Sequence, residues 1–497
     1  MATARARQGY TRPFSELVFG PWLLLPLAVL FGAFLAYQFF HLTPRYVKLL
    51  FAVSVFIGLV RLPFHAAIAV FLVLWTTPTF VFIGDTNVIL IGVMAVLWIV
   101  WRRLGVLPRR EQTPLEWAIP VYLGCHLLSF INLESGYALA GARDTMVFIL
   151  AGCLFYVLVV DGLRTESHLR LALKMFCVTA AFVDVTAIAD HYFGFRLIPE
   201  WFLFAPATTA GVEIGDRAGG VFGSHGLLAD FSAMSFYVQI MLGMRARSRA
   251  AKWLYYGLAA LSVQMIVMTV NRGGLGIWTL GGLYFLWLNR RRVRWVHVVL
   301  LAPVAALLSG AVGVFGDRFF YKVRVLDRLL KTQLFRGVPE TRVGVWTAVV
   351  GHIPEHPWIG HGPFIDLRRG AAGGMYWPHN AYLFYLYTTG ILGLASWLWI
   401  LGKIIWLTFP RGPVDFKRDS LARVTMVVFH IQTIMFATSQ ILSDHQRGDV
   451  YYYYMWILFA LASVGWRLSR AEKRRQRVGG ELGLRRPSAP PATAGVR

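Results

Sequence analysis

The amino-acid sequence predicts an all-α membrane protein: a polytopic transmembrane helical bundle of about 12–14 spans with a large external loop containing short helices. The chain has 497 residues, of which 57% are apolar and only 15% charged, and its mean hydropathy is +0.56. Long uncharged runs recur from Trp22 to Trp466. Because backbone polar groups in lipid must find partners within their own segment, runs of this length are expected to be helices.

Each predicted span is an apolar run bounded by a more polar loop. The spans lie near 22–40, 46–60, 65–83, 87–101, 115–131, 144–160, 169–189, 224–243, 253–270, 274–288, 296–313, 379–401, 420–441 and 450–466. The second and fourth are short, so they could merge with a neighbour or dip partway into the bilayer, which makes about twelve spans the alternative. Together the runs define a transmembrane bundle over residues 1–467.

The basic residues of the chain are distributed unevenly. There are 49 Lys and Arg against 25 Asp and Glu, a formal charge of +24, which in a soluble chain would suggest a nucleic-acid partner. Here the basic residues cluster after every second span, as in cytoplasmic loops. The clusters are Arg102/Arg103/Arg109/Arg110, Arg164/Arg170/Lys174, Arg245/Arg247/Arg249/Lys252, Arg290/Arg291/Arg292/Arg294, Lys403/Arg411/Lys417/Arg418 and Arg467–Arg477. We therefore expect both termini in the cytoplasm, membrane lipids as partners and no nucleic acid.

The remaining loops are predicted to be external. They are 132–143, 190–223, the turn at 271–273, the long stretch 314–378 and 442–449. Within the long stretch, residues 317–334 alternate apolar and basic side chains. They are expected to form an amphipathic helix, either on the membrane surface or packed on the bundle. Residues 468–497 are predicted to be a basic, disordered cytoplasmic tail.

Several common sources of chemistry are missing from the sequence. No G-x-x-x-x-G-K-[ST] loop, H-E-x-x-H motif or Asp-x-Asp pair occurs, and the three cysteines all lie inside predicted spans. His352, His356 and His361 are close in sequence, but Pro354 and Pro357 disfavour a single helical face. We therefore expect no metal and no cofactor, so that any reaction relies on basic side chains.

Three arginines are predicted to lie on the external side, where arginine needs an explanation. Arg272 ends a span in the turn between two apolar runs and is followed by Gly273 and Gly274, which allow a ligand or another backbone to approach closely. Arg217 precedes a glycine-rich stretch, and Arg342 lies in the long external loop. An anionic ligand would account for all three. The alternatives are a snorkelling arginine for Arg272 and ordinary surface arginines for the other two.

His379 and Asn380 mark the start of another apolar run on the same predicted side. A histidine exchanges a proton near neutral pH, so His379 is a candidate general base for a hydroxyl group. A capping or packing histidine is the alternative.

These motifs, taken in order, resemble the O-antigen ligase/polymerase superfamily of bacterial envelope enzymes. The matching pieces run from about 200 to 402: Arg217-Ala-Gly-Gly-Val-Phe-Gly, Asn271-Arg272-Gly-Gly-Leu, Arg342 with Trp346, Pro357-Trp-Ile-Gly-His-Gly362, His379-Asn380-Ala-Tyr-Leu383 and Gly390-Ile-Leu-Gly393. The resemblance implies an inverting, metal-independent membrane glycosyltransferase of the bacterial inner membrane. It would move a glycan from an undecaprenyl-diphosphate carrier to a glycan or lipid A–core acceptor at the periplasmic face.

The resemblance also implies roles for individual residues. Arg217 and Arg272 would hold the diphosphate, and His379 would be the base. Arg342, Asn380, Gly273 and Gly274 would contact substrate.

Three other functions stay open from the sequence. A polymerase of the same superfamily would share the catalytic pattern and differ in its acceptor. A transporter of lipid-linked glycan would place charges at mid-membrane depth, where Asp230 is one candidate. A structural scaffold of the envelope would need neither Arg272 nor His379.

Overall fold

The fold is all-α, as predicted. The computed structural model describes residues 57–58, 61–74, 86–107, 113–133, 135–193, 220–222, 225–269, 271–290, 340–362, 378–441 and 451–481, and every regular element in these ranges is helical. The predicted spans near 22–40, 46–60 and 296–313 and the amphipathic segment 317–334 lie outside the described residues.

The helices follow the predicted spans closely. Their bounds are α4 Phe64–Leu74, α5 Thr86–Arg103, α6 Ala118–Ser129, η1 Phe130–Asn132, η2 Ser135–Tyr137, α7 Ala138–Asp144, the π-helix η3 Thr145–Leu150, α8 Ala151–Gly162, α9 Glu166–Phe193, η6 Gly220–Phe222, α10 His225–Arg245, α11 Arg249–Met268, α12 Arg272–Leu288, α16 Glu340–His352, η7 Ile353–Glu355, α18 Ala381–Thr408, α19 Leu421–Ser439 and α20 Tyr451–Glu481. Four of them, α9 up to Asp190, α10, α18 and α19, are long and apolar enough to cross a membrane.

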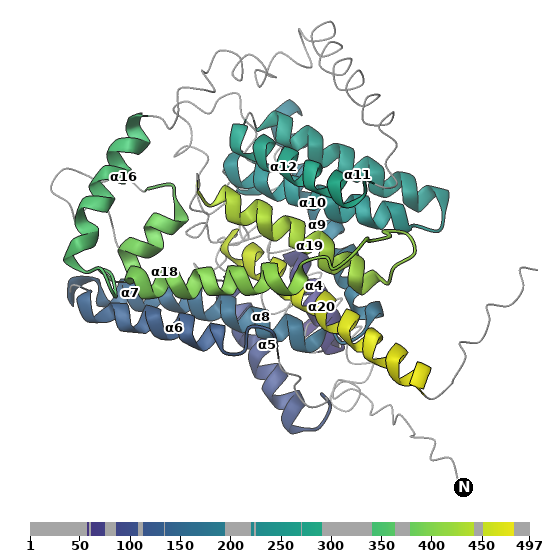
Figure 1. Cartoon of the computed structure of the whole chain (residues 1–497), viewed down its shortest axis with the longest axis horizontal. Helices are drawn as coiled ribbons and strands as arrows, with labels where there is room; N and C mark the ends of the chain where they lie inside the picture. Colours follow the sequence, from purple (N-terminus) through teal and green to yellow (C-terminus); the bar gives the residue numbers. More distant parts are fainter. Residues whose placement is uncertain are drawn as a thin grey trace, which may run out of the picture.

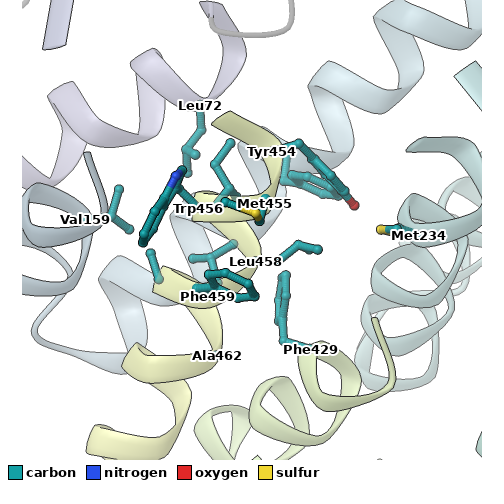
Figure 2. Close-up of a cluster of buried hydrophobic side chains, with 14 of the residues drawn as sticks. Leu72, Val159, Met234, Phe429, Tyr454, Met455, Trp456, Leu458, Phe459 and Ala462 are labelled. Atoms are coloured by element: carbon teal, nitrogen blue, oxygen red, sulfur yellow. The ribbon is translucent and has the colours of Figure 1, made fainter. Parts of the chain in front are cut away.

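The first half of α20 lies in the middle of the bundle. From Tyr454 to Ala462 its side chains are fully buried. Figure 2 shows Trp456 and Phe459 of this helix facing Val159 of α8 and Phe429 of α19. Tyr454 packs at its other side against Phe176 of α9 and Phe231 of α10. Such burial on all sides removes a large apolar area from the surroundings and makes α20 the centre of the core.

α20 also extends further than predicted. The tail was expected to begin at residue 468, but the helix continues to Glu481. Residues 468–478 contain no glycine or proline and are rich in good helix formers, so the helix can propagate beyond the apolar segment. Residues 482–497 of the predicted tail lie outside the described residues.

One end of the bundle, called the basic end below, gathers the residues of the predicted cytoplasmic loops. Arg245 at the end of α10 donates to the carbonyl oxygens of Phe416 and Asp419, at 3.1 and 2.7 Å. Arg467 of α20 donates to the carbonyls of Val160 and Leu163, both at 2.7 Å. These contacts join four segments in two pairs, because Arg245 meets the loop after α18 and Arg467 meets the end of α8. Each pair brings two of the predicted basic loops side by side.

An aromatic layer accompanies the basic end. Exposed tryptophans occur at the start of α6 and α11 and at the end of α12 and α18, namely Trp117, Trp253, Trp287 and Trp406. The guanidinium of Arg290 lies 4.7 Å from the ring centroid of Trp287. Tryptophan and basic side chains together are typical of the membrane–water interface.

The opposite end, called the site end below, is where α10, α12 and α18 begin. α10 and α12 run in the same direction, since Ala229 meets Gly274 and Tyr237 meets Gly281. α19 runs against them, since His430 bonds Tyr284 at 3.0 Å while Met435 meets Gly281. The end of α19 therefore lies at the site end, where the Tyr382 hydroxyl of α18 donates to Ala437 at 2.6 Å. In Figure 1, α16 lies at the left, beside α18 and α7, and α20 leaves the bundle at the right.

α18 is broken near the site end, and a segment distant in sequence forms hydrogen bonds with the backbone groups at the break. Gly390 has φ 66° and ψ −167°, which interrupts the helical hydrogen bonds around it. Residues 357–362 supply substitutes: the amides of His361 and Gly362 donate to the carbonyls of Tyr387 and Thr388, both at 3.0 Å. In return, the amides of Ile391 and Leu392 donate to the carbonyls of Pro357 and Trp358, at 2.8 and 3.2 Å. The two motifs of the sequence, 357–362 and 390–393, thus form one structural unit.

Glycine is required on both sides of this unit. A Cβ on Gly390 would overlap the carbonyl group of Trp358, and a Cβ on Gly360 would overlap the carbonyl group of Thr388. Both glycines also have positive φ, 66° and 68°, a region that residues with a side chain rarely adopt. Asn132, after α6, fastens the unit by donating to the Gly360 carbonyl at 2.8 Å.

We expect Gly390→Ala to lower the free energy of unfolding by about 2 kcal/mol or more, since positive φ alone costs about 1–2 kcal/mol and the added carbon must also displace backbone. Gly402→Ala in the same helix is the matched control, because nothing lies within 4 Å of its Cβ position. That variant should be unchanged or more stable by roughly 0.5–1 kcal/mol. Thermal unfolding in detergent measures both, and equal shifts would contradict this role of Gly390.

Candidate functional site

Asn271 sets the start of α12 and thereby the position of Arg272. Its side-chain oxygen accepts from the Gly274 amide at 3.0 Å, which caps the helix. Arg272 is then the first helical residue, at the site end as predicted. The free amides of the first helical turn carry partial positive charge, so this position favours an anion.

The two glycines after Arg272 have different roles. Gly273 is exposed, and the nearest atom to its Cβ position is the Asn271 side-chain oxygen at 3.1 Å. Gly274 is buried, and its Cβ would overlap Ala229 of α10. The close approach expected at Gly274 is thus an approach of another helix. It holds the starts of α10 and α12 together.

Arg217 lies outside the described residues, but the residues that follow it are placed. Gly220 has φ 51°, and its Cβ position is 3.0 Å from the Cβ of Ala187 in α9. This short 3-10 turn, Gly220–Phe222, leads into α10 at His225. The turn Gly220–Phe222 therefore lies beside α9 and the start of α10, at the site end.

His379 and Asn380 begin α18 in an unusual backbone conformation. The Asn380 side-chain oxygen accepts from the amides of Tyr382 and Leu383, both at 3.0 Å, so this residue caps the helix. His379 is exposed and has φ 49°; among the described residues other than glycine it is the one with positive φ. Residues held in sparsely populated conformations cluster at functional sites.

α16 joins the site through Trp346. The indole N–H of Trp346 donates to the Pro378 carbonyl at 2.5 Å, directly before His379. Val349 of α16 and Tyr387 of α18 form a small buried cluster behind this contact. Position 342 lies one turn before Trp346, so the two positions share a face of α16. The fold therefore brings the segments of Arg342 and His379 together, although they are far apart in sequence.

Glu355 forms hydrogen bonds with two of the three histidines near it in sequence. One carboxylate oxygen bonds a ring nitrogen of His352 at 2.8 Å and the other bonds His361 at 3.2 Å. The hydrogen bonds from His352 and then His361 lower the pKa of the exposed Glu355 carboxyl below its ordinary value. Within the described residues, no group of three or more His, Cys, Asp or Glu side chains is arranged to hold a metal ion.

Gln440 is a site-end residue that the sequence reasoning missed. It follows α19, and its carbonyl accepts from the Ala381 amide at 3.0 Å, beside Asn380. Its side chain is fully buried, and neither atom of its amide has a hydrogen-bond partner among the described residues. A glutamine at the end of an apolar run carries no distinctive signal in sequence. The unpaired amide becomes visible only in the folded chain.

The geometry defines the class of protein: a helical membrane bundle with an arginine and a histidine at the starts of two helices at one end. The comparisons with known proteins show a partial likeness to one family. Residues 257–398 match the family model described as O-antigen ligase. A Pseudomonas aeruginosa protein named "O-antigen ligase" is 39% identical over 59 residues, which are 12% of this chain and 15% of that protein.

The matched region begins within α11 and ends within α18. It contains six of the predicted site residues, Arg272, Gly273, Gly274, Arg342, His379 and Asn380, whereas Arg217 precedes it. Helices outside the matched region pack against these positions: Ala229 of α10 meets Gly274, and the end of α19 accepts a hydrogen bond from Tyr382 of α18.

We expect Asn380→Ala to destabilise the protein by about 1 kcal/mol, because the first amides of α18 lose their acceptor. Ser420→Ala removes the equivalent cap of α19 at the basic end, where Ser420 accepts from the Arg423 amide, and should cost a similar amount. Asn380→Asp keeps an acceptor and should retain stability. A fully stable Asn380→Ala protein in thermal unfolding would rule out the capping role.

Proposed function

We propose that this protein is a membrane glycosyltransferase that moves a glycan from an undecaprenyl-diphosphate carrier to an acceptor sugar at the periplasmic face. The observation that carries the proposal is that three elements begin at the same end of the bundle: α10 after the turn Gly220–Phe222, α12 at Arg272 and α18 after His379. The match of residues 257–398 to the O-antigen ligase family model supports it. The basic end would then face the cytoplasm, with both termini on that side.

In the proposed reaction, the acceptor hydroxyl oxygen forms a bond to the anomeric carbon while the bond from that carbon to the diphosphate oxygen breaks. His379 takes the proton of the hydroxyl, and the carrier leaves as undecaprenyl diphosphate. Attack from the face opposite the leaving group inverts the anomeric carbon. No metal or cofactor is part of the proposal.

Arg217 and Arg272 would stabilise the charge that develops on the diphosphate. A guanidinium stays protonated and matches phosphate oxygens with two donors at once. The starts of α10, α12 and α18 add partial positive charge at the same end. Because this charge grows as the glycosidic bond breaks, fixed donors favour the transition state over the ground state. Arg342, Gly273 and Asn380 would contact substrate around this centre.

A ligase and a polymerase share this chemistry and differ in the acceptor, which is a lipid A–core for the first and a carrier-linked repeat for the second. Envelope glycan from a deletion strain distinguishes them on a gel. Polymer that accumulates on the carrier indicates a ligase. Single repeats on the core lipid, with the ladder lost, indicate a polymerase. A transporter is a weaker alternative, because the segments that converge lie at one end of the bundle rather than at mid-depth.

Arg272→Ala is expected to reduce glycan transfer by roughly 100-fold or more while the protein remains inserted, since one fixed donor to a developing charge contributes about that factor. His379→Ala should slow transfer by a comparable factor with carrier binding retained. Transfer is measured with membranes from complemented deletion cells.

The matched control is Arg290→Ala, which removes an arginine just beyond the other end of α12, where it lies over Trp287. This variant should transfer normally. Normal glycan in the Arg272→Ala strain would refute the diphosphate role. Loss of carrier binding in His379→Ala would refute its assignment as the base.

Gln440 would recognise the acceptor. An amide with both its donor and its acceptor unpaired matches a sugar hydroxyl, which also donates and accepts, better than phosphate oxygens, which only accept. Because the amide is covered in this structure, the neighbouring side chains must move when the acceptor binds.

Gln440→Leu should therefore raise the KM for the acceptor by roughly 10-fold, the effect of losing one or two hydrogen bonds, and leave the KM for the carrier unchanged. Gln432→Leu within α19 is the control, because the nitrogen of that amide already donates to the Met234 carbonyl at 2.8 Å and only its oxygen is unpaired among the described residues. It should change stability and neither KM. Equal changes in both KM values for Gln440→Leu would contradict an acceptor role.

A further inference from the structure

Two buried aspartates of this bundle have different hydrogen-bond and ion-pair partners. Asp161, at the end of α8, is ion-paired with Arg102 and with Arg164, the latter at 2.6 Å, and accepts from the Trp98 indole at 2.7 Å. Its negative charge is therefore matched by basic side chains. The second, Asp184 in α9, is fully buried and has a different set of neighbours.

The carboxyl group of Asp184 contacts only hydroxyl groups among the described residues. The Ser262 hydroxyl of α11 lies 2.9 Å from Oδ2, and the Ser232 hydroxyl of α10 lies 3.4 Å from Oδ1. No described Arg, Lys or His forms an ion pair with it. A bare carboxylate inside a membrane bundle is strongly unfavourable, since two hydroxyl dipoles do not balance a full charge. Among the described residues nothing supplies the positive charge that would balance an ionised Asp184.

The polar surroundings continue along one face of α10. Ser232, Ser235 and Gln239 are spaced by three and four residues, so they share a face, and all three are fully buried. The Gln239 side-chain oxygen lies 3.1 Å from the Ser262 hydroxyl. Within the described part of the chain, the Ser235 hydroxyl and the Gln239 side-chain nitrogen have no hydrogen-bond partner. The Ser235 hydroxyl oxygen offers an additional ligand near the carboxyl group, whereas the Gln239 nitrogen can only donate.

With the Gln239 oxygen toward Ser262, the hydrogen atoms of this cluster do not satisfy every acceptor; the exchanged amide orientation would satisfy them and still leave the Asp184 charge unmatched. Ser262 has one hydroxyl hydrogen but lies within bonding distance of two acceptors, Asp184 Oδ2 and Gln239 Oε1. A proton on Oδ2 resolves this, because Asp184 then donates to Ser262 and Ser262 donates to Gln239. A sodium ion resolves it as well, because it takes oxygen ligands from the carboxylate, the hydroxyls and the amide.

We propose that Asp184, Ser232, Ser262 and Gln239 form a binding site for one monovalent cation, a proton or a sodium ion, in the core of the bundle. The evidence for this site does not depend on the proposed glycosyl transfer. It connects α9, α10 and α11, and α10 begins at the site end, where its start is held against α12 by Ala229 and Gly274. Occupancy of the cation site would therefore stabilise the helix pair that positions Arg272.

A carbodiimide that partitions into lipid tests the proposal, because it adds covalently to a protonated carboxyl group and not to a carboxylate held by arginine. The full-length protein in phosphatidylcholine vesicles is treated with dicyclohexylcarbodiimide in choline chloride or in sodium chloride. Modified residues are then located by mass spectrometry. Asp184 should be modified in choline chloride, whereas Asp161 should not. Protection of Asp184 by sodium identifies a sodium site, and equal modification in both salts identifies a proton site.

Residue-level mapping separates Asp184 from other buried ionisable groups on the surrounding helices: Asp230 and Tyr237 of α10, His430 of α19 and Tyr454 of α20.

A second measurement covers the case in which the reagent does not reach the site. In choline chloride, Asp184→Asn should keep the wild-type Tm within about 2 °C, since the amide replaces a neutral carboxyl group. Asp161→Asn, which leaves two arginines unmatched, should lower Tm by about 5 °C or more.

Modification of Asp184, or an unchanged Tm for Asp184→Asn, supports a bound cation. An Asp184 that stays unmodified in choline chloride, together with a Tm loss for Asp184→Asn as large as that for Asp161→Asn, overturns the proposal. In that case the carboxyl group is ionised and held by fixed protein groups.

Discussion

The exchange of backbone hydrogen bonds at Gly390 is the interaction on which the site end depends. A helix broken inside an apolar bundle leaves amides and carbonyls without partners, at a cost that no side chain nearby can offset. Residues 357–362 provide four of these partners with their own backbone, at 2.8 to 3.2 Å. Because the exchange uses backbone atoms, it fixes the register between the two segments, and with it the position of α16 over the start of α18.

The two ends of the bundle handle charge in opposite ways. At the basic end, Arg245 and Arg467 donate to backbone carbonyls and Arg164 pairs with Asp161. At the site end, helix starts are capped by the asparagines at 271 and 380, each of which satisfies one or two amides. Helix starts carry partial positive charge, which is part of the reason why we propose an anionic ligand at this end.

Local signals were sufficient for the helices and for several site positions. Apolar runs of membrane-spanning length predicted α10 and α19 within a few residues of their observed bounds, because lipid leaves helices as the main solution for such segments. Asparagine before an apolar run marks a helix start by local hydrogen bonding, so Arg272 and His379 could be placed at helix ends without tertiary information. The continuation of α20 to Glu481 was missed because the composition was read as a disordered tail.

Contacts between distant segments could not be derived in this way. Glycines in a sequence allow either a ligand or another backbone to approach closely. The fold shows which of the two occurs: Ala229 packs against Gly274, and the backbone of Trp358 packs against Gly390. Likewise, Gln440 and Asp184 are ordinary residues of apolar helices until burial shows which of their polar atoms have partners. The sequence by itself determined the helices, their direction and the chemistry available at their ends, since these follow from local periodicity and solvation. The tertiary structure decided which of those ends meet, because that depends on packing between residues that are tens to hundreds of positions apart.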